Sequence, residues 1–138
     1  MDTTVKDIYA ELIRVRCLAY CPYSDHPVGI VVIDENGVLS SGCNVEAAHF
    51  KGLCGEASAI SRMIAQGGRI IRDLYILGPP ENPACPPCGD CRQRIREFAD
   101  EHSRIHAFDK KGEIAWTYTI DELLPQSFGP DNILTRQK

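Results

Sequence analysis

Three cysteines at two distant places in the chain constrain its fold more than any other feature. Cys54 lies in the segment CGE (54–56), and Cys88 and Cys91 lie much later, in PCGDC (87–91). The Cys-x-x-Cys spacing lets two sulfurs bind one metal ion, and zinc favours thiolate ligands in a tetrahedron. A catalytic zinc takes three ligands from the protein and leaves the fourth position to water. The cysteines therefore predict a fold that brings both segments to one catalytic zinc ion.

Glu56 follows the first of these cysteines by two residues. That spacing would put its carboxylate beside the metal without binding it, which is the place for a proton shuttle. Zinc deaminases combine a three-cysteine centre, a glutamate that is not a ligand and a P-C-x-x-C segment. An ordinary acid in the first turn of a helix is the alternative interpretation of Glu56. A further cysteine also leaves open a closed structural site of four thiolates, Cys54, Cys85, Cys88 and Cys91.

Composition limits the class of protein. With 138 residues, 43% of them hydrophobic, we expect one globular domain over residues 1–138. The net charge of -4 and the absence of any Lys or Arg run favour a small-molecule substrate over a nucleic-acid partner. No signal-peptide pattern or apolar run of membrane-spanning length occurs, so we expect a cytoplasmic protein without a membrane partner. Seven cysteines with metal-like spacing indicate reduced thiols, with Cys17, Cys21 and Cys43 as buried or bystander thiols.

Hydrophobic periodicity predicts helices that alternate with strands. Apolar residues at helical spacing predict three helices, at 5–19, from Cys54 to the Gly67-Gly68 stop, and from Cys88 to about 99. Short apolar runs predict strands at 28–33, 38–42, 74–77, 105–108 and 114–119. The Asn36-Gly37 turn between the first two predicts that they are antiparallel. This alternation predicts an α/β layer fold with a largely parallel sheet. Both metal-binding segments then lie at helix N-termini, where the helix dipole stabilises thiolates.

Five segments, in order along the chain, resemble the small homotetrameric cytidine deaminases. They are YCPYSDHPVG (20–29), GCNVE (42–46), CGE (54–56), PCGDCRQRIREF (87–98) and ELLPQSFGPD (122–131). The resemblance implies a three-layer α/β/α fold with a mixed five-stranded sheet and one zinc ion per chain. It implies hydrolytic deamination of cytidine or deoxycytidine to uridine or deoxyuridine and ammonia, as in pyrimidine salvage. It also implies a homotetramer with shared active sites.

The same resemblance assigns roles to the metal-site residues. It implies that Cys54, Cys88 and Cys91 are the zinc ligands and that Glu56 is the catalytic acid and base. The spacing of the cysteines and of Glu56 predicts the same roles for these four residues.

For the substrate we expect five binding residues: Asn44, Glu46 and Phe128, which the resemblance implies, and with them Gly55 and His26. From the residues alone, His26 could instead be an ordinary loop side chain before Pro27. Asn44 and Glu46 fall where the family holds the ribose hydroxyls. Phe128 lies on a tail of about residues 121–138 that reaches a neighbouring subunit, where an aromatic side chain covers the base. From the residues alone, Asn44 could instead be a turn residue, Glu46 a solvated loop acid, and Phe128 a side chain that packs its own tail.

Three features depart from the family's pattern. His26 stands where the family has Phe, and Ala57 stands where the family usually has an Arg that offsets the charge of the thiolates. The loop before the CGE motif is one residue shorter, and its HFKG segment (49–52) is similar to the blasticidin S deaminases. Helix N-termini or Arg92 would then offset the thiolate charge. Two alternatives stay open: a deaminase of another amino-pyrimidine such as a blasticidin S-type compound, and a non-catalytic structural zinc module.

Overall fold

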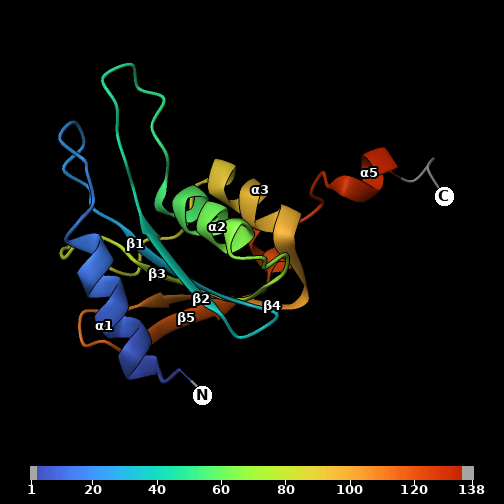
Figure 1. The fold of residues 1–138 in the computed structure, drawn as a ribbon, viewed down its shortest axis with the longest axis horizontal. Helices are drawn as coiled ribbons and strands as arrows, with labels where there is room; N and C mark the ends of the chain where they lie inside the picture. Colours follow the sequence, from blue (N-terminus) through green and yellow to red (C-terminus); the bar gives the residue numbers. More distant parts are fainter. Residues whose placement is uncertain (1–2, 135–138) are drawn as a thin grey trace.

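The computed structural model describes residues 3–134, which form a five-stranded sheet between two layers of helices (Figure 1). No helix within 3–134 is both long enough and apolar enough to cross a membrane. In chain order the elements are α1 (Val5–Arg16), β1 (Gly29–Asp34), β2 (Leu39–Cys43), α2 (Gly55–Ala65), β3 (Ile71–Leu77), α3 (Gly89–Phe98), β4 (Ala99–Phe108), β5 (Ile114–Tyr118), α4 (Ile120–Leu123) and α5 (Pro130–Leu134).

The sheet is mixed, as the family resemblance implied, and its strand order is β2-β1-β3-β4-β5. Among the described strands only β3 and β4 run parallel, so the expectation of a largely parallel sheet is wrong. The reason is the connections. Two tight turns, one at Asn36-Gly37 with Gly37 at φ 77° and one at 109–112, force the pairs that they join to be antiparallel. Only β3-α3-β4 is a crossover unit with a helix between parallel strands.

Helix α1 covers one face of the sheet. The Thr4 hydroxyl caps it by accepting a hydrogen bond from the backbone N–H of Asp7 at 3.1 Å, and the Asp7 carboxylate accepts one from the backbone N–H of Thr4 at 3.3 Å. Its buried side chains pack against Val31, Leu77 and Phe108. The helix ends at Arg16, earlier than the predicted 19, because Leu18 points to solvent and Tyr20 already pairs with the loop at Val45. The β-bridge between Tyr20 and Val45 therefore ends the helix before the helical periodicity of the sequence does.

Helices α2 and α3 lie side by side on the opposite face of the sheet (Figure 1). Their buried apolar residues and those of the strands form the larger core, which includes Ile30, Ala59, Met63, Leu74, Ile76, Ile95 and Ile105. Helix α2 approaches β2 so closely that a Cβ on Gly42 would lie 2.6 Å from the backbone N of Ala59. Burial of these side chains stabilises the fold by about 1.5 to 3 kcal/mol each. The core thereby fixes the N-termini of both helices relative to each other.

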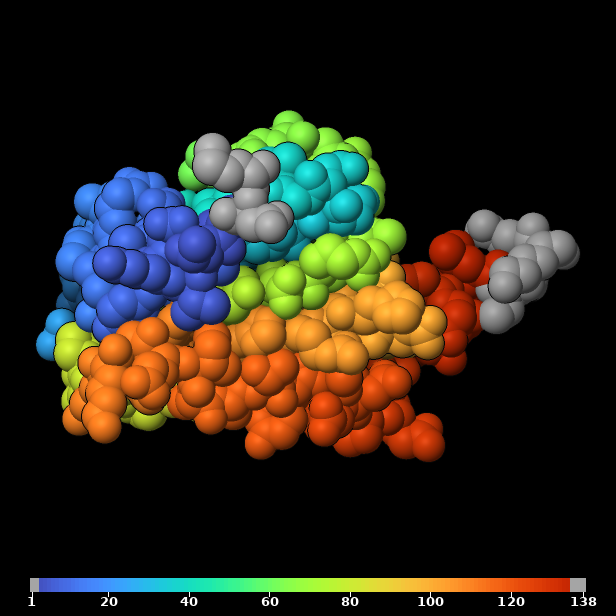
Figure 2. All heavy atoms as spheres, turned by 90° about the horizontal axis from the view of Figure 1, so that it is seen from below, coloured from blue at the N-terminus to red at the C-terminus, as the bar shows by residue number. Residues whose placement is uncertain are grey.

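The C-terminal segment leaves the body of the molecule (Figures 1 and 2). The predicted tail contains no helix over 124–129, as expected, but only 127–129 are without a turn, since 124–126 form a bend and turn with Gln126 at φ 52°. Short helices lie on either side of this segment. A capping box at Thr119 begins α4, and Pro130 takes the first position of α5, where its missing N–H costs nothing. The last four residues of the predicted tail, 135–138, lie outside the described residues.

Candidate active site

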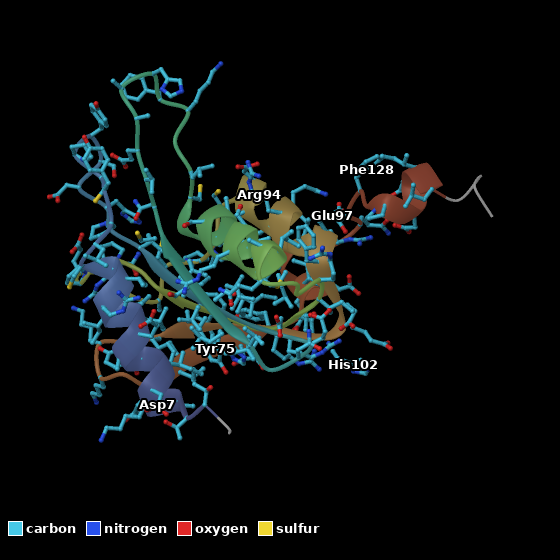
Figure 3. All side chains as sticks on the ribbon, in the orientation of Figure 1. Asp7, Tyr75, Arg94, Glu97, His102 and Phe128 are labelled. Atoms are coloured by element: carbon cyan, nitrogen blue, oxygen red, sulfur yellow. The ribbon has the colours of Figure 1, made fainter. Side chains whose placement is uncertain are left out.

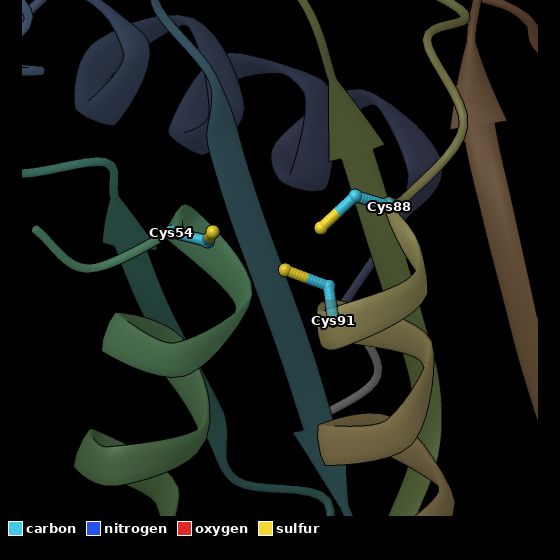
Figure 4. Close-up of side chains that lie close together, drawn as sticks. All are labelled: Cys54, Cys88 and Cys91. Carbon is cyan, nitrogen blue, oxygen red and sulfur yellow. The ribbon is translucent and has the colours of Figure 1, made fainter. Parts of the chain in front are cut away.

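The metal-binding cysteines lie where two helices begin. Cys54 is the N-cap residue of α2 and Cys88 is the N-cap residue of α3, and neither side chain caps its own helix. Cys91 follows in the first turn of α3 and is 1% exposed. Figure 4 shows the three sulfurs pointing toward one another from the two helix ends. Unsatisfied N–H groups at both N-termini therefore face the place where thiolate charge would gather.

The three sulfurs fit one zinc ion. The Sγ atoms of Cys54, Cys88 and Cys91 all lie within 4.8 Å of one another. Tetrahedral zinc with Zn–S bonds of about 2.3 Å requires sulfurs about 3.8 Å apart, so small side-chain rotations are enough to bind it. Cys85 is not a member of this group, and its Sγ lies 3.9 Å from Nε2 of His26 instead. The arrangement thus favours an open site with three ligands over a closed cage of four.

Burial disfavours the charged form of two of the three thiols, those of Cys54 and Cys91. Burial raises the pKa of Cys91 far above its ordinary value, with the Glu56 carboxylate as the next cause, and burial also raises the pKa of Cys54. Thiolates bind metal only after they lose their protons, so a divalent cation at this point reverses the balance. Three converging thiols, of which Cys91 is buried and Cys54 half-buried, are thus a donor set that suits a soft metal ion.

Glu56 lies in the first turn of α2 and is 5% exposed. It shares a cavity with the cysteines but is not one of the grouped ligands. Burial raises its pKa, and a hydrogen bond with Cys91 acts in the opposite direction. A carboxyl group that is buried beside a metal, and does not bind it, can accept and return protons.

The cavity at this site has a volume of about 220 Å³. Besides the metal ligands it is lined by apolar and polar residues, which are His26, Val28, Asn44, Gly55, Glu56, Ile76, Cys85, Pro86 and Pro87. Gly55 is required by packing, since a Cβ there would lie 2.8 Å from a side-chain carbon of Ile30 on β1. Three of the five predicted substrate-binding residues, His26, Asn44 and Gly55, therefore lie in the same cavity as Glu56.

Asn44 and Glu46 are joined by a hydrogen-bond network through the loop before β1. Asn44 accepts from the backbone N–H of Val28 at 2.9 Å and donates to the carbonyl oxygen of His26 at 2.9 Å. The backbone N–H of His26 donates to the Ser24 hydroxyl, which itself donates to Glu46. These hydrogen bonds hold the loop of residues 24–28 at the edge of the cavity, which His26 and Val28 help to line.

Glu46 does not line the zinc cavity within this chain. It lies in a neighbouring pocket with Tyr23, Ser24 and Phe50, and its carboxylate accepts hydrogen bonds from the backbone N–H groups of Tyr23 and Ser24. The hydrogen bond from Ser24 is the largest cause that lowers the pKa of Glu46. These contacts of Glu46 with Tyr23 and Ser24 could not be predicted from the sequence, because hydrogen bonds between distant loops leave no spacing pattern.

Phe128 lies far from the cavity of its own chain. It is 60% exposed and borders a small pocket beside α3 and α5 (Figure 3). The tail that carries it is attached to α3, because Gln93 donates to the Phe128 carbonyl oxygen at 2.8 Å and Arg96 donates to the Ser127 hydroxyl at 2.8 Å. The ring is thus held outward on an anchored tail.

Arg92 supports the metal loop from behind. Its guanidinium donates to the carbonyl oxygen of Pro87 at 2.8 Å and to that of Leu123 at 2.7 Å, which ties the loop before Cys88 to α4. No Lys or Arg is among the described residues that line the cavity. The two helix N-termini are therefore the positive groups directed at the cysteines.

Most of the chain is similar in sequence to known cytidine deaminases. Residues 3–107 match the model of the cytidine and deoxycytidylate deaminase zinc-binding region. A cytidine deaminase of Sporosarcina psychrophila is 35% identical over 130 residues, which cover 94% of each chain. A cytidine deaminase of Mycoplasma genitalium is 31% identical over 129 residues, covering 93% of this chain and 98% of that protein.

Solved structures agree in fold. The crystal structure of cytidine deaminase from Mycobacterium leprae superimposes with a TM-score of 0.76 at 32% identity, over 91% of this chain and 100% of that one. The cytidine deaminase from Burkholderia pseudomallei superimposes with a TM-score of 0.82 at 27% identity, with the same coverage. The cavity with its three cysteines and Glu56 thus lies within a fold shared with these enzymes.

Proposed function

The chain belongs to the family of cytidine and deoxycytidylate deaminases, and from this premise we propose which residues carry each part of the reaction. It is a zinc-dependent hydrolase that deaminates cytidine and deoxycytidine to uridine and deoxyuridine, with release of ammonia. One observation carries the assignment of chemistry to residues: a buried carboxylate shares a cavity with three convergent thiols. A structural zinc module would have no need of Glu56 in that position.

Cys54, Cys88 and Cys91 hold the zinc ion, which supplies the Lewis-acid chemistry that makes water a nucleophile near neutral pH. Glu56 takes a proton from the attacking water and passes it to N3 of the pyrimidine as the water oxygen adds to C4. The Glu56 carboxylate then takes the proton of the new C4 hydroxyl group and gives it to the exocyclic amine, which leaves as ammonia while the C4 carbonyl forms. Its burial keeps bulk water from competing for these protons. Glu56 therefore acts more than once in each turnover.

Asn44, Gly55 and His26 contact the nucleoside from the cavity wall. Gly55 contributes backbone to this wall, and its lack of a side chain lets the start of α2 pack closely against Ile30 on β1. Asn44 and Glu46 bind the ribose hydroxyls at the rim, with Glu46 turning from its pocket beside Ser24. A ribose hydroxyl offers the donor that an ionised carboxylate needs.

The active site is shared between chains of a homotetramer. A flat base above the metal needs a cover on its exposed face, and Phe128 is anchored too far from its own cavity to supply one. A wide groove of about 660 Å³ on α2 and α3, with Leu53, Ile64 and Phe98 in its lining, leaves apolar surface open for a neighbouring chain. In a symmetric assembly the tail of one chain, about residues 121–138, then reaches the site of another. The whole chain, residues 1–138, acts as one deaminase domain, and the tail belongs to it.

We place the reaction in pyrimidine salvage in the cytoplasm. The support is chemical: the cysteines are all free within the described residues, and a three-thiolate centre persists only where thiols stay reduced.

A substrate comparison tests the proposed function. Purified holoenzyme is incubated separately with cytidine, deoxycytidine and blasticidin S while the ultraviolet absorbance of the amino-pyrimidine is followed. Loss of absorbance with cytidine and deoxycytidine, and release of one ammonia per product, is the expected result. Turnover of blasticidin S alone would favour the rival substrate that His26 and the short 49–52 loop suggest. No turnover of any of the three by zinc-loaded protein would mean a structural zinc module.

A further inference from the structure

Cys85 and His26 face each other on the wall of the zinc cavity and do not belong to the group of metal-binding cysteines. Cys85 comes from the loop between β3 and α3, and His26 comes from the loop between α1 and β1. The Sγ atom of Cys85 lies 3.9 Å from Nε2 of His26. A thiol and an imidazole from two separate loops thus meet beside the catalytic centre.

The separation of these two atoms suits a shared metal ion. Zinc binds sulfur at about 2.3 Å and imidazole nitrogen at about 2.0 to 2.1 Å, so at the tetrahedral angle the two donors lie about 3.6 Å apart. The observed 3.9 Å differs from that value by a few tenths of an ångström, which a small side-chain rotation removes. The pair therefore needs no backbone movement to bind a cation.

The charge of the cavity favours a second cation. Three thiolates on one divalent zinc leave an excess of one negative charge, and the Glu56 carboxylate lies in the same cavity. Ala57 brings no positive charge, and the described residues that line the cavity include no Lys or Arg. A negative, partly enclosed pocket concentrates positive ions.

We propose that Cys85 and His26 form a second, inhibitory binding site for a thiophilic divalent cation such as Zn²⁺ or Cd²⁺. The Cys85 thiol releases its proton to buffer as its sulfur binds the cation, His26 binds through Nε2, and water fills the remaining positions. The charge argument rests on the three-cysteine zinc centre of the proposed function, whereas the geometry of the pair does not. With two protein ligands instead of three, this site binds more weakly than the first.

A cation at this position takes part of a cavity of about 220 Å³ and stands in the way of the substrate. Free zinc therefore acts as a reversible inhibitor that raises the apparent KM more than it lowers kcat. Substrate in turn weakens binding of the second cation, since the two compete for one space.

Equilibrium dialysis of the one-zinc holoenzyme against increasing free Zn²⁺ tests the proposal. The parent should take up a second equivalent and lose activity over the same concentration range. Cys85→Ala and His26→Ala should each keep the first zinc and bind the second at least tenfold more weakly, with inhibition measured against each variant's own uninhibited rate. Cys17→Ala, which removes an exposed thiol outside the cavity, is the matched control and should behave like the parent.

A spectroscopic measurement keeps the test independent of activity. Cd²⁺ added to the one-zinc protein should produce a new sulfur-to-metal absorption band in the parent and in Cys17→Ala, and this band should be absent from Cys85→Ala and Cys85→Ser. A parent that binds only one cation, or a second equivalent that both Cys85 variants bind as tightly as the parent, would overturn the proposal. So would loss of the first zinc from correctly folded Cys85→Ser, because Cys85 would then belong to the catalytic centre.

Discussion

The predicted metal-site residues and two of the predicted substrate-binding residues differ in where they lie relative to the cavity of their own chain. The three cysteines and Glu56 are held between the starts of α2 and α3, and the core beneath them belongs to the same chain. Phe128 and Glu46, in contrast, lie outside the cavity of their own chain, the first on an anchored tail and the second in a separate pocket. On the proposed assignment, one chain supplies all of the metal-binding and proton-transfer residues but only part of the residues that bind the substrate.

The largest expected effect comes from the metal ligands. Cys54→Ala, Cys88→Ala or Cys91→Ala leaves two thiols where zinc needs three, so each variant should lose both its zinc and its measurable activity. Cys85→Ala should retain one zinc per chain, because its sulfur lies outside the group. Metal analysis of the four purified variants decides this. Loss of zinc from Cys85→Ala would instead indicate a closed structural site of four cysteines and would contradict the enzyme assignment.

Next in size is the effect of Glu56→Gln. The amide keeps the shape of the side chain but cannot transfer protons, and positioned proton transfer contributes about a hundredfold to ten-thousandfold in rate. We expect kcat to fall by at least that factor while zinc content and melting temperature stay near the parent values. If the variant instead kept activity within a few-fold of the parent, Glu56 would be a structural acid at a helix start.

Substitution of the predicted ribose-binding residues Asn44 and Glu46 should have a smaller effect on activity. Asn44→Ala or Glu46→Ala removes hydrogen bonds to a ribose hydroxyl, which are worth about 1.5 to 3 kcal/mol where one partner is charged. Each should lower kcat/KM for cytidine tenfold or more and leave the zinc content unchanged. Ser24→Ala is the matched control for Glu46, since it loosens the same loop without removing the carboxylate. Unchanged kinetics in both rim variants would point to a substrate without a ribose at this place.

The sequence predicted the parts of the molecule that depend on local spacing. Cys54 and Cys88 begin helices as expected, because N-cap positions and helical periodicity are readable over a few residues. The Asn36-Gly37 turn correctly predicted that β1 and β2 are antiparallel. The sequence alone did not predict the antiparallel pairing of β1 with β3, because that pairing depends on the whole topology. It also did not predict that Tyr23 and Ser24 bind Glu46 or that Cys85 faces His26, because such contacts join separate loops.

Mixed assemblies test most directly the claim that each chain has a complete metal centre and an incomplete substrate pocket. Phe128→Ala keeps the cysteines but loses base stacking worth about 1 to 3 kcal/mol, and Cys88→Ala keeps the tail but loses zinc. Each homogeneous variant should be poor. When the two are co-assembled, some sites combine an intact metal centre with an intact Phe128 from the other chain, so activity should rise well above the sum of the separate variants. The double variant, Phe128→Ala with Cys88→Ala, co-assembled with Phe128→Ala is the control and should give no rise. Proven mixed assemblies without recovery, or a monomer in light scattering that turns over cytidine at the full rate, would contradict the shared site.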